Sequence, residues 1–199
     1  MKKHNSEIKP IDGTDGRTIV FDLEANGLLD DVTRIHCIAY YDSETDEIHS
    51  YNDECNWKKP TGTGKGMSSP IIRAIQYLEQ AEIIIGHNVI GYDIPVIRKL
   101  YPFFKPLGTV IDTLLLSRLY HPRLMSLDKE RNWNHMPLQL YGRHSLEAYG
   151  YRLGEYKGEY GKTTDWKEWS KELEDYCKQD VAVTKKLCDH FHPYLSGLR

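Results

Sequence analysis

Residues 18–24 read TIVFDLE, an apolar run whose acidic side chains stand only near its end. β-Branched and aromatic residues favour extended backbone, so the run predicts a strand at the centre of a sheet. Asp22 and Glu24 are two residues apart and leave the same face of that strand, whereas Leu23 points to the opposite face. Burying two carboxylates together is costly unless a cation neutralises them, so the pair is a candidate metal site. The alternative is a strand end that frays into solvent.

Four more strands are predicted from runs rich in β-branched and aromatic residues, at residues 34–41, 47–51, 82–86 and 109–111. The first three strands follow one another directly, and the last two alternate with helical segments. This order indicates an α/β domain with a mixed sheet and helices on both faces.

Helices are predicted in five segments, and in the first of them apolar residues recur at helical spacing behind a capping residue. These segments are a helix from Pro70 behind Ser69, residues 94–101, a helix from the cap Asp112 to Tyr120, a short helix near 145–149, and residues 172–192. The glycine-rich segment 58–69 lacks the spacing of a phosphate-binding loop and is predicted to be a surface linker. Residues 121–143 show no clear period and are predicted to form one long loop.

Asp93 stands beyond the end of the predicted strand 82–86 and directly before Ile94 and Pro95. Open α/β sheets place their sites beyond the carboxyl ends of strands, which makes this carboxylate a candidate site residue. An aspartate directly before a helix is also a natural N-cap, and taken alone the capping role is the stronger interpretation.

Tyr176 and Asp180, in the segment YCKQD, are four residues apart and share one face of the last predicted helix. An apolar stripe includes that face and turns it toward the core, through Leu173, Val183, Leu187 and Phe191. A carboxylate that points into the core needs a partner, and the two alternatives are a metal ion and an arginine.

Composition limits the classes of protein to which the chain can belong. Its 199 residues suffice for one sizeable α/β domain. No stretch approaches the roughly 18 apolar residues of a membrane span, and the polar start MKKHNSEIKP lacks the apolar centre of a secretory signal. We therefore expect no membrane association and a cytoplasmic location. The net charge of −3 argues against a protein that coats duplex nucleic acid, so any nucleic-acid contact must be local.

The four cysteines, at positions 37, 55, 177 and 188, form no regular framework and are expected to be reduced, mostly buried thiols. Cys188 lies close in sequence to His190 and His192, which raises zinc as an alternative. Packing within a helix is the favoured interpretation of these three residues.

The motifs, in this order along the chain, resemble those of a known superfamily. D-x-E at Asp22 and Glu24, HNVIGYD ending at Asp93, and Y-x-x-x-D at Tyr176 and Asp180 resemble the three exonuclease motifs of the DnaQ-like, ribonuclease H-fold superfamily. The tyrosine four residues before the last aspartate is typical of its DEDDy branch. Four longer segments are similar to the N-terminal proofreading domain of podophage family A replicative polymerases: FDLEANGLL, HNVIGYD, IDTLLLSRLYH and HSLEAYGYRLGEYKGEY.

The resemblance implies a ribonuclease H-like, mixed five-stranded sheet with helices on both faces. It also implies a two-metal-ion 3′→5′ exonuclease that hydrolyses terminal phosphodiesters of single-stranded or frayed DNA to nucleoside monophosphates, for proofreading in phage DNA replication. Two Mg²⁺ or Mn²⁺ ions would be held by four acids: Asp22, Glu24, Asp93 and Asp180. Tyr176 would orient the attacking water, because a phenol is protonated at neutral pH and is a poor base.

Substrate contacts follow from the resemblance with less detail. Leu28 matches a position that packs against the terminal base, although a role as an ordinary core residue is almost equally open. Asn88 is a candidate for hydrogen bonding to the substrate or for bracing the site. Aromatic and basic candidates for contacts to bases and backbone are Tyr92, Trp133, Tyr149, Tyr151, Arg118, Arg123, Arg131 and Arg143. For each aromatic residue alone a packing role is the favoured interpretation, and for each arginine alone a solvated surface role.

We divide the chain into an N-terminal extension, residues 1–17, and an exonuclease domain, residues 18–199. The expected partners are single-stranded DNA 3′ ends and, as a candidate, a separately encoded DNA polymerase; the location is the host cytoplasm if a phage encodes the chain. Two alternatives stay open: an RNA exonuclease of the ribonuclease D kind, and a non-catalytic module that docks on a polymerase.

Overall fold

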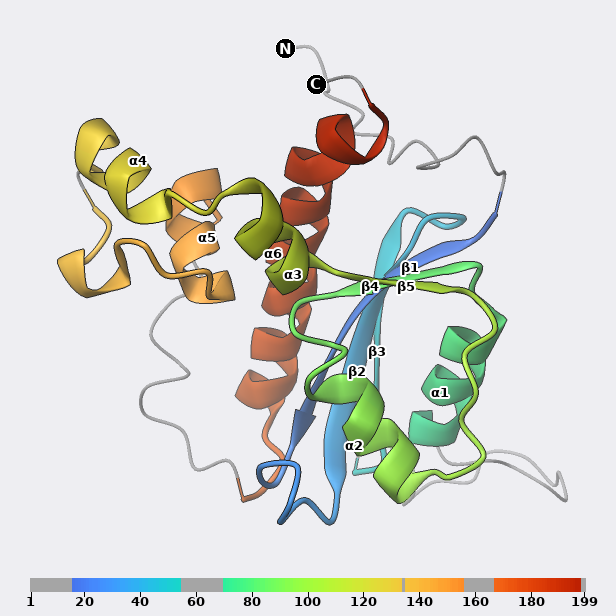
Figure 1. The fold of residues 1–199 in the computed structure, drawn as a ribbon. Helices are drawn as coiled ribbons and strands as arrows, with labels where there is room; N and C mark the ends of the chain where they lie inside the picture. The colour runs from blue at the N-terminus through green and yellow to red at the C-terminus, as the bar shows by residue number, and fades with distance from the viewer. Residues whose placement is uncertain (1–15, 55–69, 134, 156–166, 198–199) are drawn as a thin grey trace, which may run out of the picture.

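In the computed structural model, which describes residues 16–54, 70–133, 135–155 and 167–197, five strands form one mixed sheet (Figure 1). The strands are β1 Thr18–Ala25, β2 Ile35–Asp42, β3 Glu47–Asn52, β4 Ile83–Gly86 and β5 Thr109–Asp112. They lie in the order β3-β2-β1-β4-β5, with antiparallel pairing on the β2 side of β1 and parallel pairing on the β4 side. The predicted mixed five-stranded α/β fold is confirmed, and the TIVFDLE run is its central strand.

Six α-helices and one 3-10 helix lie within the described ranges. They are α1 Pro70–Gln80, α2 Asp93–Leu100, α3 Thr113–Tyr120, α4 Leu124–Arg131, η1 Leu138–Leu140, α5 Leu146–Leu153 and α6 Lys171–Leu195. Asp112 caps α3 as predicted, because its carboxylate accepts a hydrogen bond from Leu114 N at 2.9 Å. Among the helices in these ranges, none is both long enough and apolar enough to cross a membrane.

The two faces of the sheet are covered by different helices, with α6 on one side and α1 and α2 on the other (Figure 1). Phe21 and Leu23 of β1 pack in the core cluster that contains α1 and α2, whereas Val20 packs with α6. Successive residues of a strand alternate between faces. Asp22 and Glu24 therefore leave β1 on the face that α6 covers, which brings the first and last motifs of the chain together.

Several predicted features lie outside the described residues: residues 1–15 of the extension, the linker 58–69 with its Ser69 cap, and Cys55. The last residue of the predicted extension, Arg17, lies against the sheet. Its carbonyl oxygen accepts a hydrogen bond from Glu82 N at 3.0 Å, and its guanidinium pairs with the buried Asp42 of β2.

The prediction of one long loop over residues 121–143 is wrong, because α4 and η1 lie within it. α4 has almost no helical periodicity of apolar residues, so the pattern on which the prediction depended is absent there. Its buried residues are Leu124 and Asp128, and Asn132 ends it in the left-handed conformation, with φ at +46°. The helix is held by tertiary contacts rather than by an apolar stripe of its own.

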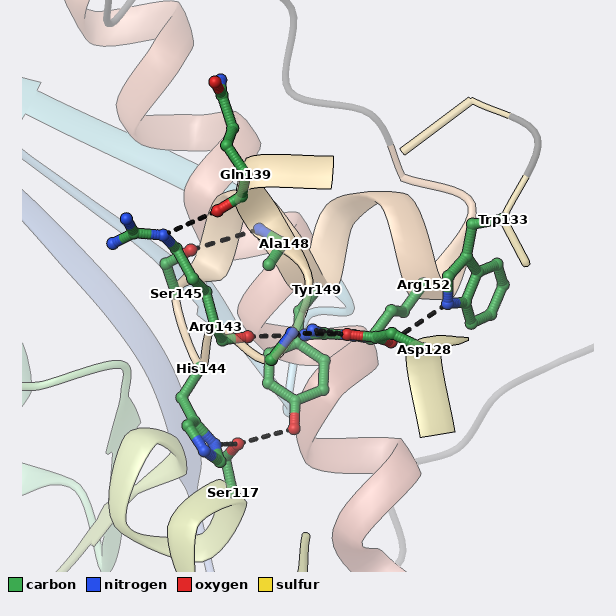
Figure 2. Close-up of polar contacts among 11 residues, drawn as sticks. Ser117, Asp128, Trp133, Gln139, Arg143, His144, Ser145, Ala148, Tyr149 and Arg152 are labelled. Carbon is green, nitrogen blue, oxygen red and sulfur yellow. Dashed lines mark hydrogen bonds and ion pairs between the residues drawn. The ribbon is translucent and has the colours of Figure 1, made fainter. Parts of the chain in front are cut away.

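Asp128 joins α4 to α5 through a buried ion pair (Figure 2). Its two carboxylate oxygens accept hydrogen bonds from Arg152 Nε at 3.0 Å and Arg152 Nη2 at 2.7 Å. They also accept from Trp133 Nε1 at 3.0 Å and from Gly142 N at 2.8 Å. Burial disfavours the charged carboxylate, but the hydrogen bonds from Arg152 and Gly142 outweigh it and hold the pKa of Asp128 below its usual range.

We expect Asp128→Asn to lower the free energy of unfolding by about 2 kcal/mol at neutral pH, because the charge that pairs with Arg152 is lost. The pKa of Asp128 is lower in the folded than in the unfolded chain. Its stabilisation is therefore present above the unfolded pKa of about 3.9 and is lost as the pH falls through the folded pKa. Urea titrations of wild type and variant should show a difference that shrinks in acid.

The control for this prediction is Asp175→Asn, which removes an exposed carboxylate of α6. It should change the free energy of unfolding by less than about 0.5 kcal/mol. An equal loss of stability in Asp128→Asn at neutral and acid pH would contradict a role for the charge.

Candidate active site

Asp22 and Glu24 meet a thiol on the α6 side of β1. The potential ligand atoms of Asp22, Glu24 and Cys177 all lie within 4.8 Å of one another. Glu24 is buried and Asp22 is half-buried. Both pair in register with β2, Asp22 with Ala39 and Glu24 with Cys37, so the alternative of a frayed strand end is excluded. Among the residues that the structure describes, this is the one group of three or more His, Cys, Asp or Glu side chains whose ligand atoms converge.

α6 is held across the sheet beside this acidic pair. The Cys177 thiol donates a hydrogen bond to the main-chain oxygen of Asp22 at 3.4 Å. Nearly one turn earlier, the buried Glu174 accepts hydrogen bonds from two side chains of β3. Asp180 is buried and Tyr176 is half-buried, so the predicted face of the helix does turn toward the core. The helix therefore presents the Y-x-x-x-D motif on the side of the sheet where the D-x-E motif emerges.

Asp93 is bound to the backbone of β1 between the two acidic residues of that strand. Its Oδ1 accepts a hydrogen bond from Leu23 N at 3.3 Å, and the side chain is buried. Burial raises the pKa of Asp93 above its usual range, and the negative charges of Asp112 and Asp180 add to the rise. The favoured capping role is wrong: α2 begins at Asp93 itself, and Tyr92 at the N-cap position makes no capping hydrogen bond.

Tyr92 fixes the loop that carries Leu28. Its hydroxyl donates a hydrogen bond to the Gly27 oxygen at 2.5 Å. Burial raises the pKa of Tyr92, and the charges of Asp93 and the acids of β1 raise it further, as expected for a ring beside the acidic group. Leu28 is 76% exposed, so the alternative that it is a core residue is wrong. A large apolar side chain thus stands in solvent on a loop that is tied to the acidic site.

Asn88 lies in the turn that leads to Asp93, with a positive φ of 66°. Asp112 organises this turn, because its carboxylate accepts hydrogen bonds from Asn88 N at 2.9 Å and Ile90 N at 3.1 Å as well as capping α3. Gly91 faces the Asn88 side chain, since a Cβ there would lie 2.6 Å from Asn88 Oδ1. Asn88 is exposed.

The other substrate candidates differ in exposure. Tyr149 is buried and its hydroxyl hydrogen-bonds to Ser117 Oγ at 2.6 Å, so it is a packing residue rather than a stacking platform (Figure 2). The four arginine candidates are all exposed: Arg118, Arg123, Arg131 and Arg143. Cys188 packs in the core cluster on the α6 side of the sheet, and within the described residues it forms no converging ligand group with His190 and His192.

The sequence analysis does not identify two residues, Asp112 and Cys177, as part of the site. Asp112 was predicted only as a helix cap, although its position directly after a parallel strand was a signal for the same edge of the sheet that carries Asp93. Cys177 was predicted only as a buried thiol. Its place inside the Y-x-x-x-D motif was the available signal. Whether Cys177 faces β1, however, depends on how α6 crosses the sheet.

The comparisons with known proteins agree with the fold. A family model described as the RNase H superfamily matches residues 19–192. The DNA-directed DNA polymerases of Enterobacteria phage T3 and Escherichia phage T7 are each 35% identical over 193 residues, covering 86% of this chain and 26% of the polymerase. The chain thus spans about a quarter of the length of these relatives. A structure of Brucella melitensis NrnC bound to pGG is 16% identical with a TM-score of 0.52, covering 91% of this chain and 83% of that one, and it supports the fold.

Proposed function

The chain belongs to the RNase H superfamily, and from this membership we propose that it is a two-metal-ion 3′→5′ exonuclease acting on single-stranded or frayed DNA ends. The observation that carries the proposal is the meeting of the three motifs. Asp22 and Glu24 leave β1 toward α6, Asp93 binds the amide between them, and α6 carries Tyr176 and Asp180. Each motif alone has a structural explanation, whereas a metal site would explain why all three are arranged around β1.

The donor set fits hard divalent cations. Its four acids supply oxygen ligands only, the type that Mg²⁺ and Mn²⁺ prefer, and Glu24, Asp93 and Asp180 are buried. Burial raises the pKa of Asp93, and the negative charges of Asp112 and Asp180 add to the rise; bound cations would offset both effects. Two such cations, when bound, supply positive charge that activates a water and stabilises the leaving 3′ oxygen.

The side chains of the site then have distinct roles. The four acids hold the cations: Asp22, Glu24, Asp93 and Asp180. Tyr176 offers a hydroxyl that can donate to or accept from the attacking water and so hold it in line with the scissile bond. The loop with Leu28 and the turn with Asn88 meet the terminal nucleotide, Leu28 by packing against its base and Asn88 by hydrogen bonding.

The nature of the relatives supports DNA as the substrate and proofreading in phage DNA replication as the biological role. Two DNA polymerases are 35% identical to the chain. A separately encoded DNA polymerase is the partner we propose, in the cytoplasm of the host. Degradation of matched single-stranded DNA and RNA would separate this proposal from an RNA exonuclease of the ribonuclease D kind, which should prefer RNA.

Metal removal is the experiment that tests the proposed chemistry. We expect excess EDTA to stop release of nucleotides from a 5′-labelled single-stranded DNA, and Mg²⁺ or Mn²⁺ to restore it. Ca²⁺ should support binding of the DNA but little hydrolysis, because its looser coordination holds reacting groups less strictly in line. Full activity in excess chelator would exclude the two-metal mechanism.

Leu28→Ala tests the proposed contact with the terminal base. We expect kcat/KM on single-stranded DNA to fall by about tenfold, the effect of losing roughly 1.4 kcal/mol of apolar contact. Because Leu28 is exposed, the free energy of unfolding should change by less than about 0.5 kcal/mol. Leu107→Ala is the matched control, since Leu107 is 88% exposed and outside the site. Equal kcat/KM values for the two variants would remove Leu28 from the substrate site.

A further inference from the structure

The converging ligand group at β1 is not made of oxygen alone. Cys177 Sγ, from α6, lies within 4.8 Å of a carboxylate oxygen of Asp22 and of one of Glu24, both from β1. The thiol is fully buried, and its sulfur is this close to both carboxylates. Its hydrogen bond to the Asp22 main-chain oxygen, at 3.4 Å, fixes the sulfur on the strand that carries both acids. Two carboxylates and one thiol therefore share a single small volume.

The spacing suits a small tetrahedral ion. Zinc binds sulfur at about 2.3 Å and carboxylate oxygen at about 2.0–2.2 Å, so ligand atoms around one ion are roughly 3.3–3.7 Å apart. The ligand atoms all lie within 4.8 Å of one another, so the proposed site needs them to close by no more than about 1.5 Å. The strand and the helix that carry the three ligands are already in contact.

Sulfur is a soft ligand, so it strengthens the binding of some metal ions and not of others. Thiolate selects Zn²⁺ and Cd²⁺, whereas Mg²⁺ is bound by carboxylate, carbonyl and water oxygens. When a thiophilic ion binds, the metal–sulfur bond forms as the thiol proton leaves to solvent, and no electron is transferred. With Mg²⁺ the thiol keeps its proton and its hydrogen bond to Asp22.

We infer that Asp22, Glu24 and Cys177 form a second mode of metal binding, a mixed sulfur and oxygen site for Zn²⁺ or Cd²⁺ that excludes the ions used for hydrolysis. Only the expected inhibition of hydrolysis rests on the proposed function. A thiophilic ion withdraws Asp22 and Glu24 from the hydrolytic arrangement, so it competes with Mg²⁺ for the same two carboxylates. Binding of the ion itself needs no nuclease activity.

The test uses the 199-residue chain with Cys55→Ser, so that the remaining thiols are Cys37, Cys177 and Cys188. Metal-free protein is titrated with Cd²⁺ under reducing conditions while thiolate-to-cadmium charge-transfer absorption is recorded. We expect a band that saturates at one equivalent and that Cys177→Ser removes, with Cd²⁺ affinity lowered by about tenfold or more. Cys188→Ser is the matched control, because Cys188 is also a buried thiol of α6 but lies outside the ligand group, and it should keep the band.

Cadmium X-ray absorption on the wild-type chain gives a second measurement that needs no variant to fold. A shell of oxygen with one sulfur supports the site, and a shell of oxygen alone overturns it. Survival of the charge-transfer band in Cys177→Ser also overturns it. Inhibition of Mg²⁺-supported hydrolysis by Zn²⁺, expressed relative to each variant's own rate, should weaken about tenfold or more in Cys177→Ser. Loss of all hydrolysis with the band retained would contradict the proposed function and leave the metal site standing.

Discussion

Asp22→Ala and Asp180→Ala are each expected to reduce the single-turnover rate of DNA hydrolysis by at least about 10³-fold, because each removes a ligand of the catalytic cations. Asp22 and Asp180 come from different motifs, one on the central strand and one on α6. The burial pattern of both elements depends on their apolar neighbours, so the variants should keep the fold. Relief of carboxylate crowding can even raise their stability.

The matched control is Asp175→Ala, which removes a carboxylate of the same helix that is exposed and paired with Lys171. It should hydrolyse DNA at nearly the wild-type rate. Circular dichroism and thermal unfolding would establish that all three variants are folded. A folded Asp22→Ala or Asp180→Ala protein that loses less than about tenfold in rate would show that the ligand assignment is wrong.

Tyr176→Phe is expected to slow hydrolysis by about 10²-fold or somewhat more, because the ring stays packed while the hydroxyl that orients the water is removed. The effect should lie in the chemical step and not in metal binding. Single-turnover rates measured across a Mg²⁺ titration should therefore show a lower plateau with little change in the Mg²⁺ concentration at half-maximum. The carboxylate variants should be slower than Tyr176→Phe at every concentration.

Tyr194→Phe is the control for this change, since Tyr194 is a half-buried tyrosine near the other end of α6 that packs among Tyr120 and Phe191. Its hydroxyl has no proposed part in the reaction, so its rate should stay close to wild type. Wild-type hydrolysis by Tyr176→Phe across the titration would make Tyr176 a packing aromatic, while the four-acid site would stand.

The fold was predictable where one local pattern determines one element. Strand β1 follows from its β-branched run, and the alternation of side chains along it places Asp22 and Glu24 on one face before any partner is known. The last helix was predicted to within a few residues, because its apolar stripe repeats over the whole length of α6. α4 could not be predicted in this way, since its order depends on Asp128 and Arg152, which are 24 residues apart.

The site was predictable as a set of residues but not as a set of contacts. Asp93 was favoured as a helix cap, and only the packing of α2 against β1 shows that its carboxylate instead accepts from Leu23 N. The proximity of Cys177 to the acids depends on the path of α6 across the sheet, which no spacing within YCKQD encodes. Tyr149 was a candidate for stacking because it is a tyrosine, but its neighbours bury it.

The most direct test of a metal-dependent 3′→5′ exonuclease is a time course on single-stranded DNA labelled at its 5′ end, with Mg²⁺ and with chelator, in which both the shortened strands and the released products are identified. The account predicts a ladder that retreats from the 3′ end one nucleotide at a time, release of nucleoside monophosphates, and no reaction in chelator. Internal cuts, loss of the 5′ label as the first product, or no Mg²⁺-dependent shortening by folded protein would contradict it.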